Sequence, residues 1–302
     1  MSKTAFISGA SGFIGSHISE RLYNLGYKVF AVIARGERLP KATQVLDLNL
    51  NGIAWDLVPK IDICFHQAAN NDTTDMNRER MLRANFTAPV DLFYRLNEKK
   101  KCRKFVYASS ASVYGHQKTA FSETAPTQPL NPYAESKLLF DGFASMFSME
   151  YKTNVIGLRY TNVYGPGEEH KGKRASMIHQ LLHQMRSGKR PKIFSDGEQL
   201  RDWVYIQDVV DANLVAAECP SSGVYNIGAG ENISFNRLVT LLNELLETNY
   251  EPEYVECPFR QAYQDFTLAD LSKVKKELNW HPQYSIAAGV RKFVEETKTA
   301  RI

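Results

Sequence analysis

The sequence is poor in the features that mark metal centres and disulfide frameworks. Only four cysteines occur among 302 residues, far apart and without a CxxC pair, so neither a zinc site nor a disulfide framework is predicted. His179 and His183 share a helix face, but no glutamate follows the first histidine in the HExxH pattern and no third ligand accompanies them. We therefore expect no metal.

Long apolar runs and basic runs are missing as well. A glycine-rich segment cuts short the apolar run at residues 4–7, which argues against a signal peptide or a spanning helix there. The net charge of +4 is diffuse, and no basic run lies beside an aromatic ladder, so nucleic-acid binding is not indicated. We expect a cytoplasmic protein of the globular class, with neither membrane nor nucleic acid as a partner.

The first half of the chain alternates short apolar runs with longer helical patterns. Strand followed by helix in strict turn predicts right-handed crossovers and an α/β fold with a doubly wound parallel, Rossmann-like sheet. After Gly165 the elements are shorter and are separated by glycine-containing turns, which predicts a second, smaller α/β domain. The predicted domains are a dinucleotide-binding domain at 1–165 and a mainly substrate-binding domain at 166–302, from which about 200–228 returns to the large domain.

A glycine-rich turn follows the first predicted strand. The segment "SGASGFIG" places Gly9, Gly12 and Gly15 as GxxGxxG between a strand and a helix. Glycines there permit a tight turn, a close backbone approach to a pyrophosphate and close packing of helix on strand. The N–H groups at the start of the helix then bind phosphates. The turn predicts a bound dinucleotide.

The end of the second predicted strand indicates which dinucleotide. An NAD site usually has Asp or Glu there for the ribose 2'-hydroxyl, whereas a nearby arginine suits a 2'-phosphate. Here the strand continues into Arg35 without an acidic residue, so the sequence favours NADP, with NAD as the alternative. Asp47, in "LDLN", is a candidate partner for the adenine amino group.

A tyrosine and a lysine lie four residues apart in "NPYAESK", at the start of a predicted helix. This spacing places Tyr133 and Lys137 on one helix face. A fixed positive charge favours the phenolate of a group that ordinarily titrates near ~10, and so offers a base at neutral pH. The segment "YASSASVYG" ends a strand, where ligands of doubly wound sheets bind, and presents Ser109, Ser110 and Ser112 to a substrate oxygen.

Four motifs, "GASGFIG", "YASSASVYG", "YAESK" and "RYTNVYGPG", together resemble the extended short-chain dehydrogenase/reductase family, in particular its nucleotide-sugar epimerases and dehydratases. The resemblance implies that Tyr133 is the general base and acid, that Lys137 lowers its pKa and holds the ribose, and that Ser110 assists. It also implies that Asn85 braces the active-site helix. Homo-oligomers are common in this family, so we expect one here, and the apolar helix at 138–147 offers a shared surface. The expected cofactor contacts are Gly9, Gly12, Phe13, Ile14, Gly15, Arg35, Asp47, Ala68, Asn85, Tyr133 and Lys137.

The second half is similar to the ADP-glyceromanno-heptose 6-epimerases through "YGPGEEHKGKRASMIHQLL" and "FRQAYQDFTLADL". In those enzymes the lysine of "HKG" is a second acid/base group facing the tyrosine, which implies that role for Lys171. Two arginines, Arg201 and Arg260, match residues that contact the nucleotide diphosphate, a task that suits a planar guanidinium. The implied contacts of the nucleotide-diphosphate sugar are Asn71, Thr73, Thr74, Ser110, Asn162, Lys171, Arg201, Arg260 and Tyr263.

The sequence also departs from the 6-epimerase pattern. "NND" replaces its serines before "TT", "KR" replaces "SM" after "HKG", and the acidic residue after the second strand is lost. A UDP-hexose 4-epimerase is the alternative, because it needs the same Ser110, Tyr133 and Lys137 but no second base. A dehydratase is disfavoured, because Ala111-Ser112 stands where that branch carries an Asp-Glu pair. A non-catalytic dinucleotide-binding sensor or scaffold is the alternative from another class, although such proteins typically lose the tyrosine or the lysine.

Overall fold

The computed structural model describes residues 2–34, 40–48, 55–258, 260 and 263–298. The chain forms two compact units. The first contains Met1–Ser110, Asn131–Arg159 and Val210–Tyr225, and the second contains Ala111–Leu130, Tyr160–Val209 and Asn226–Ile302. The expected division near residue 165 therefore differs from the observed one, because Ala111–Leu130 joins the second unit and the returning segment is Val210–Tyr225.

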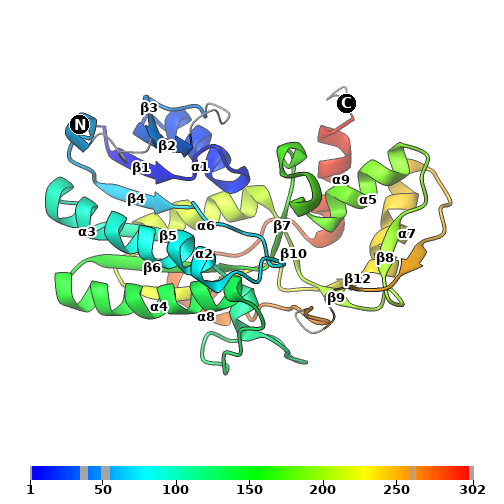
Figure 1. The fold of residues 1–302 in the computed structure, drawn as a ribbon. Helices are drawn as coiled ribbons and strands as arrows, with labels where there is room; N and C mark the ends of the chain where they lie inside the picture. Colours follow the sequence, from blue (N-terminus) through cyan, green and yellow to red (C-terminus); the bar gives the residue numbers. More distant parts are fainter. Residues whose placement is uncertain (1, 35–39, 49–54, 259, 261–262, 299–302) are drawn as a thin grey trace. The chain divides into compact units, whose positions relative to one another are not determined.

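The first unit is built on a seven-stranded sheet in the order β11-β6-β5-β4-β1-β2-β3 (Figure 1). The pairs from β3 to β5 are parallel. Both β1 and β4 are almost entirely buried, which is typical of parallel strands covered on both faces. The predicted Rossmann-like α/β fold is confirmed. The strands are β1 (Thr4–Ser8), β2 (Lys28–Ala34), β3 (Gln44–Leu48), β4 (Ile63–His66), β5 (Lys104–Ser110), β6 (Asn154–Tyr160) and β11 (Gly223–Ile227).

The strand order reverses direction at β1, since β2 and β3 lie on one side of it and β4, β5 and β6 on the other. In open α/β sheets the ligand crevice lies at such a switch point, outside the carboxyl ends of the strands. The switch point here falls between the ends of β1 and β4, where Ser8 is paired with His66.

An aromatic cluster fixes two helices against this sheet. Phe93 of α3 (Ala88–Lys100) stacks on Phe105 of β5 with ring centres 4.4 Å apart, and it meets the edge of Phe140 of α4 (Pro132–Tyr151) at 5.2 Å. Such aromatic pairs stabilise the packing beyond the effect of the apolar area that they bury.

The remaining helical elements of this unit are α1 (Phe13–Asn24), η1 (Trp55–Leu57), α2 (Arg78–Leu82), the π-helical turn η2 (Arg83–Thr87) and α6 (Ile206–Glu218), which continues from the second unit.

The paired strands of the second unit are two or three residues long. Its paired strands are parallel in β7 (Asn162–Tyr164) with β10 (Trp203–Tyr205) and in β8 (Lys192–Phe194) with β13 (Glu253–Val255), and antiparallel in β9 (Leu200–Arg201) with β12 (Ile233–Ser234). Its helices are η3 (Ala111–Tyr114), η4 (Glu169–Arg174), α5 (Met177–Arg186), α7 (Phe235–Leu246), α8 (Ser272–Leu278) and α9 (Ile286–Glu296).

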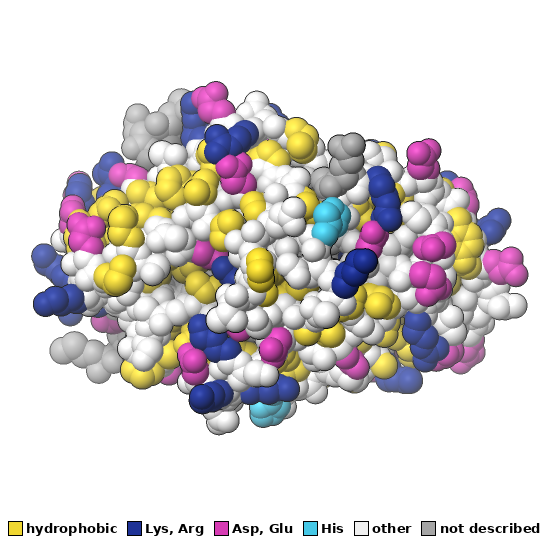
Figure 2. Space-filling view, turned by 90° about the horizontal axis from the view of Figure 1, so that it is seen from below, with side chains coloured by type: hydrophobic (Ala, Val, Ile, Leu, Met, Phe, Trp, Pro, Cys, Tyr) yellow, Lys and Arg dark blue, Asp and Glu magenta, His cyan; other side chains and the backbone are white. Residues whose placement is uncertain are grey.

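The surface and helix lengths bear on possible partners. On the face drawn in Figure 2, basic and acidic side chains are interspersed, which agrees with a diffuse net charge of +4. Within the described ranges, no helix has the length and apolar character needed to cross a bilayer.

Candidate active site

The glycine turn joins β1 to α1 at the switch point. Gly9 has φ +71°, and a Cβ there would lie 2.5 Å from the backbone nitrogen of Ala68, which follows β4. A Cβ on Gly15 would strike the carbonyl oxygen of Gly9. Bare backbone is therefore required at both positions, and the predicted cofactor residues Gly9, Gly15 and Ala68 lie together.

The start of α1 fits a phosphate group. Gly12 is its N-cap and has no side chain to satisfy the first amides, and the first turn contains no acidic residue. Phe13 and Ile14 begin the helix, and Phe13 is buried. A glycine cap and a first turn without acidic residues suit an anion at the positive end of the helix dipole, which supports a dinucleotide site.

Two further contacts of the dinucleotide are predicted, Arg35 with a 2'-phosphate and Asp47 with the adenine amino group. Arg35 lies outside the described residues. Asp47 lies in β3 and is paired with Ile33 of β2. This pairing places the backbone of Asp47 on the strand next to β2.

Tyr133 and Lys137 occupy the first turns of α4. Asn131 caps this helix by accepting a 2.9 Å hydrogen bond from the backbone N–H of Ala134, and Pro132 occupies the first turn, where its missing N–H costs nothing. The Lys137 ammonium lies 5.8 Å from the centre of the Tyr133 ring. The structure therefore brings this predicted pair together.

The ionisation of the pair differs from the expectation. Burial raises the pKa of the Tyr133 phenol, and a hydrogen bond with Ser110 opposes that rise. Burial also lowers the pKa of Lys137 to about 8, against the influence of the Asp141 carboxylate. The expected lowering of the tyrosine pKa by Lys137 does not appear in the protein alone. The lysine instead donates a 2.8 Å hydrogen bond to the carbonyl oxygen of Ala108.

Asn85 lies in the π-helical turn η2 and is buried. Its side-chain oxygen accepts a 2.7 Å hydrogen bond from the Asn70 N–H, and its amide donates to the Asn70 carbonyl at 2.8 Å and to the Ser136 hydroxyl of α4 at 3.1 Å. These bonds tie the loop after β4 to the helix that carries Tyr133. The contacts agree with a bracing role, and a π-helical turn is a frequent feature of functional sites.

His66 is a residue of this region that the sequence analysis missed. Its Nδ1 lies 2.6 Å from the hydroxyl of Ser8, the last residue of β1 before the glycine turn, so this contact joins the carboxyl ends of β4 and β1. Burial lowers the pKa of His66 to about 3, and the positive charge of Lys137 adds to the effect. The sequence does place this histidine at the end of the short apolar run "ICFH", which forms the buried strand β4, and that position could have indicated it.

Replacing His66 with glutamine should change the pH dependence of stability. The folded pKa lies below the ordinary 6.5, so the unfolded chain binds the extra proton first and stability falls as pH drops below about 6.5. This group should contribute about 1.4 kcal/mol per pH unit to that fall. Urea unfolding between pH 4 and pH 7 should show a shallower fall for H66Q than for wild type. Replacing the exposed His116 with glutamine is the control. An equal fall of the unfolding free energy with pH in H66Q and in the wild type would contradict the expectation.

The predicted sugar contacts of the first unit lie in the loop after β4. Asn71, Thr73 and Thr74 are exposed there. The Asp72 carboxylate accepts hydrogen bonds from the Thr74 N–H at 3.0 Å and the Thr74 hydroxyl at 2.6 Å, which fixes the turn. Asn71 and Thr73 are therefore better placed than Thr74 to offer polar atoms to a ligand.

In the second unit the structure brings together two of the predicted substrate contacts, Arg201 and Tyr263. The Arg201 guanidinium is buried and stacks on the Tyr263 ring, 4.7 Å from its centre. Burial lowers the pKa of Arg201, and the group donates hydrogen bonds to the carbonyl oxygens of Leu200 and Gln264. Arg260 is exposed and forms an ion pair with Asp265.

The two other predicted residues of this unit are hydrogen-bonded within it. The Asn162 amide donates to the carbonyl oxygen of Asp202 at 2.9 Å and to the Thr267 hydroxyl at 3.1 Å. Lys171 lies in η4, and its ammonium forms a 2.8 Å ion pair with Glu168. Asn162 therefore has a clear structural role in addition to any contact with a ligand.

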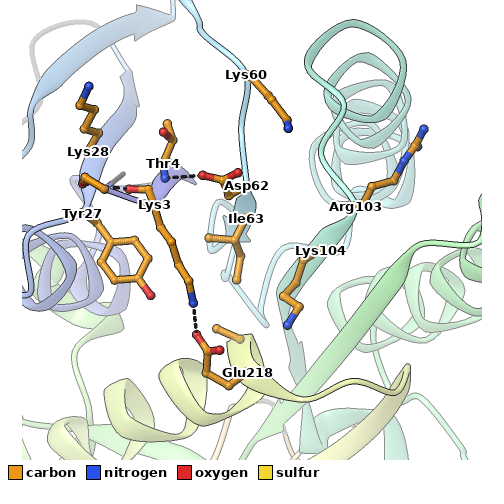
Figure 3. A pocket seen from close by; sticks show the side chains of 12 residues that line it. Lys3, Thr4, Tyr27, Lys28, Lys60, Asp62, Ile63, Arg103, Lys104 and Glu218 are labelled. Carbon is orange, nitrogen blue, oxygen red and sulfur yellow. Dashed lines mark hydrogen bonds and ion pairs between the residues drawn. The ribbon is translucent and has the colours of Figure 1, made fainter.

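A separate pocket of about 840 Å³ opens at the amino ends of β1, β2, β4 and β5 (Figure 3). Lys3 of this pocket pairs with Glu218 at 2.8 Å. The predicted site residues do not line it, and it lies at the opposite ends of the strands from the glycine turn. Because ligands of doubly wound sheets bind at the carboxyl ends, this pocket is not part of the candidate active site.

Known proteins resemble the chain over nearly its full length. A family model described as "NAD dependent epimerase/dehydratase family" matches residues 5–228. An ADP-L-glycero-D-manno-heptose-6-epimerase from Brachyspira hyodysenteriae is 36% identical over 313 aligned positions that cover 96% of each chain. The crystal structure of the Helicobacter pylori ADP-L-glycero-D-manno-heptose-6-epimerase has a TM-score of 0.86 and 33% identity, covering 99% of this chain and 97% of that one. UDP-glucose 4-epimerase from Thermotoga maritima, solved with UDP-glucose, has a TM-score of 0.89 and 28% identity, covering 98% and 99%.

Proposed function

Because this chain belongs to the NAD-dependent epimerase/dehydratase family, we propose that it inverts carbon 6 of an ADP-linked heptose. The chain is a nucleotide-sugar epimerase, and the sugar and the carbon are the proposed part. The observation that carries the proposal is Lys171, an additional amine held in an ion pair by a buried carboxylate. Together with Tyr133 it gives the protein two acid/base groups.

The proposed mechanism divides the proton transfers between these groups. When bound, the nicotinamide supplies reversible hydride transfer at the sugar carbon. Tyr133 removes the proton from the substrate hydroxyl, and the Ser110 hydroxyl bonds the same oxygen. Lys171 supplies a proton from the opposite face when the inverted centre forms. For the reverse reaction the two groups exchange these tasks.

The remaining residues hold the two nucleotides. We assign the dinucleotide phosphates to the turn at Gly9, Gly12 and Gly15, where a Cβ would meet the protein backbone. Arg201 and Arg260 are the proposed partners of the sugar-nucleotide diphosphate, because a planar guanidinium can donate two hydrogen bonds to phosphate oxygens.

NADP is the proposed form of the dinucleotide, because Arg35 follows β2 in place of an acidic residue. Denaturing the purified protein should release mainly NADP, identified by its 2'-phosphate. Arg35→Ala should weaken NADP binding by about 10-fold or more, as expected for one lost charge-assisted hydrogen bond, and should leave NAD binding nearly unchanged. Release of NAD alone from the wild-type protein would contradict the proposal.

A homo-oligomer in the cytoplasm is the proposed state of the enzyme. The side chains of Leu139, Met146 and Met149 on α4 are 41%, 48% and 73% exposed. Large apolar side chains exposed along one helix favour contact with another protein surface, and a second copy of the chain is the simplest partner. Sedimentation measurements test this state.

A UDP-hexose 4-epimerase is the second candidate, and the TM-score of 0.89 to such an enzyme favours keeping it. The deciding experiment is to incubate the enzyme with ADP-linked heptoses and with UDP-hexoses and to follow epimer formation by NMR. Interconversion of the two carbon-6 epimers of an ADP-heptose supports the proposal. Conversion only of UDP-hexoses at carbon 4 would overturn it, and no exchange with any nucleotide sugar would favour a non-catalytic sensor or scaffold.

A further inference from the structure

Glu168 is a charged residue with no exposed surface, three positions before Lys171. Each of its two carboxylate oxygens accepts two hydrogen bonds. One oxygen accepts from the Gly165 N–H at 3.2 Å and the Ser176 hydroxyl at 2.7 Å, and the other from the Ser176 N–H at 2.7 Å and the Lys171 ammonium at 2.8 Å. A buried carboxylate is costly unless its oxygens are satisfied in this way, so its position is strongly determined.

The carboxylate joins three parts of the second unit. Gly165 follows β7, Lys171 lies in η4, and Ser176 is the N-cap of α5, where its hydroxyl accepts from the His179 N–H at 3.2 Å. Within η4 the backbone turns sharply at Gly172, which has φ +54° and ψ −125°. The Lys171 side chain is therefore attached at its charged end to a fixed point inside the unit, although its backbone lies in a short turn.

Lys171 differs in this respect from its neighbours. Its side chain is 16% exposed, whereas Lys173 and Arg174 of the same turn are exposed. An exposed lysine has a flexible four-carbon stem and many rotamers. The ion pair removes most of that freedom before any substrate binds, and preorganisation of this kind is what an acid/base group requires.

We propose that Glu168 is a positioning residue for the reaction, acting through Lys171. Its carboxylate holds the ammonium of Lys171 in one orientation, so that the amine is aimed before the substrate arrives. The inference rests on the proposed function, because it assumes that Lys171 is the second acid/base group.

A double-mutant cycle tests the inference in the full-length protein. E168Q retains an amide oxygen that can face Lys171 but removes the charge, and K171M removes the amine. E168Q should lower kcat by about 10- to 100-fold, the range expected for a misplaced catalytic group, with little change in KM. In the K171M background E168Q should cause no further loss, because residues that act through one another are not additive.

A merely structural role for Glu168 predicts a different pattern. E168Q would then lower kcat by the same factor with and without Lys171, and this result would overturn the inference. Wild-type kcat in E168Q would overturn it too. If K171M itself keeps wild-type kcat, both the proposed function and the inference fail. If K171M loses activity but the effects of E168Q and K171M add, only the inference fails and the proposed function stands.

Two further measurements keep the inference testable if E168Q does not fold. In the wild-type protein, brief acetylation followed by mass spectrometry should modify Lys171 more slowly than exposed Lys173, and equal rates would contradict the inference.

Ser176→Ala removes one hydrogen bond to Glu168 and the cap of α5 but keeps the Glu168–Lys171 pair. The S176A variant should have a lower Tm but keep kcat within about twofold of wild type. A loss of kcat as large as that of K171M would show that the whole turn, rather than the ion pair, positions the lysine.

Discussion

Replacing Tyr133 with phenylalanine should lower the turnover of the nucleotide sugar by about 10²- to 10⁴-fold, the usual contribution of general acid–base catalysis. The substitution removes one oxygen atom and keeps the ring, so α4 and its cap at Asn131 should be undisturbed. The lost oxygen is the one that hydrogen-bonds with Ser110. Initial rates of epimer formation, followed by NMR at saturating substrate, measure the effect.

The matched control for this variant lies at the other end of the same helix. Tyr151 stacks on Phe147 with ring centres 4.8 Å apart, and phenylalanine can keep that contact. Tyr151→Phe should therefore retain wild-type turnover. Both variants should release as much dinucleotide on denaturation as the wild-type enzyme. A Y133F enzyme with wild-type turnover would remove the central catalytic assignment.

Replacing Lys171 with methionine should also lower turnover by about 10²- to 10⁴-fold, if it is the second acid/base group. Methionine keeps much of the apolar stem but has no ammonium to face Glu168. Lys173→Met is the matched control, because Lys173 lies two residues away in the same turn and is exposed. It should keep wild-type turnover. A K171M enzyme that epimerises UDP-hexoses at the wild-type rate would favour the 4-epimerase alternative.

The two variants should also differ in which epimer they fail to oxidise. The epimers carry the reacting hydroxyl on opposite faces of the carbon, so each acid/base group is the base for one epimer and the acid for the other. In single-turnover experiments Y133F should fail to oxidise one epimer, and K171M should fail to oxidise the other. Loss of the same epimer in both variants would contradict the two-base assignment.

The alternation of strands and helices was sufficient to predict the parallel sheet, because each element leaves a local pattern in the chain. The glycine turn was predictable for the same reason. Its position between a strand and a helix is visible in "SGASGFIG", and the structure explains the need for glycine by the contact of Gly9 with Ala68. The spacing of Tyr133 and Lys137 likewise requires only the helical repeat.

Local patterns did not predict the limits of the two units. Ala111–Leu130 follows directly on β5, yet it packs in the second unit, where the Asn226 amide donates to the Phe121 carbonyl oxygen at 2.7 Å and Tyr114 bonds the side chain of Asn226. These contacts join residues more than 100 positions apart. A long-range hydrogen bond leaves no periodic signal at either end.

The sequence by itself determined the class of fold, the glycine turn between a strand and a helix, and the residue types available for acid–base chemistry, because these depend on neighbours within a few positions. Only the tertiary structure decided how those residues are ionised and held. Burial sets the pKa values of His66, Tyr133 and Lys137, and the buried Glu168 fixes Lys171 by hydrogen bonds that also reach Gly165 and Ser176. Desolvation and satisfaction of buried charges depend on all the atoms that surround a group, and folding alone brings those atoms together.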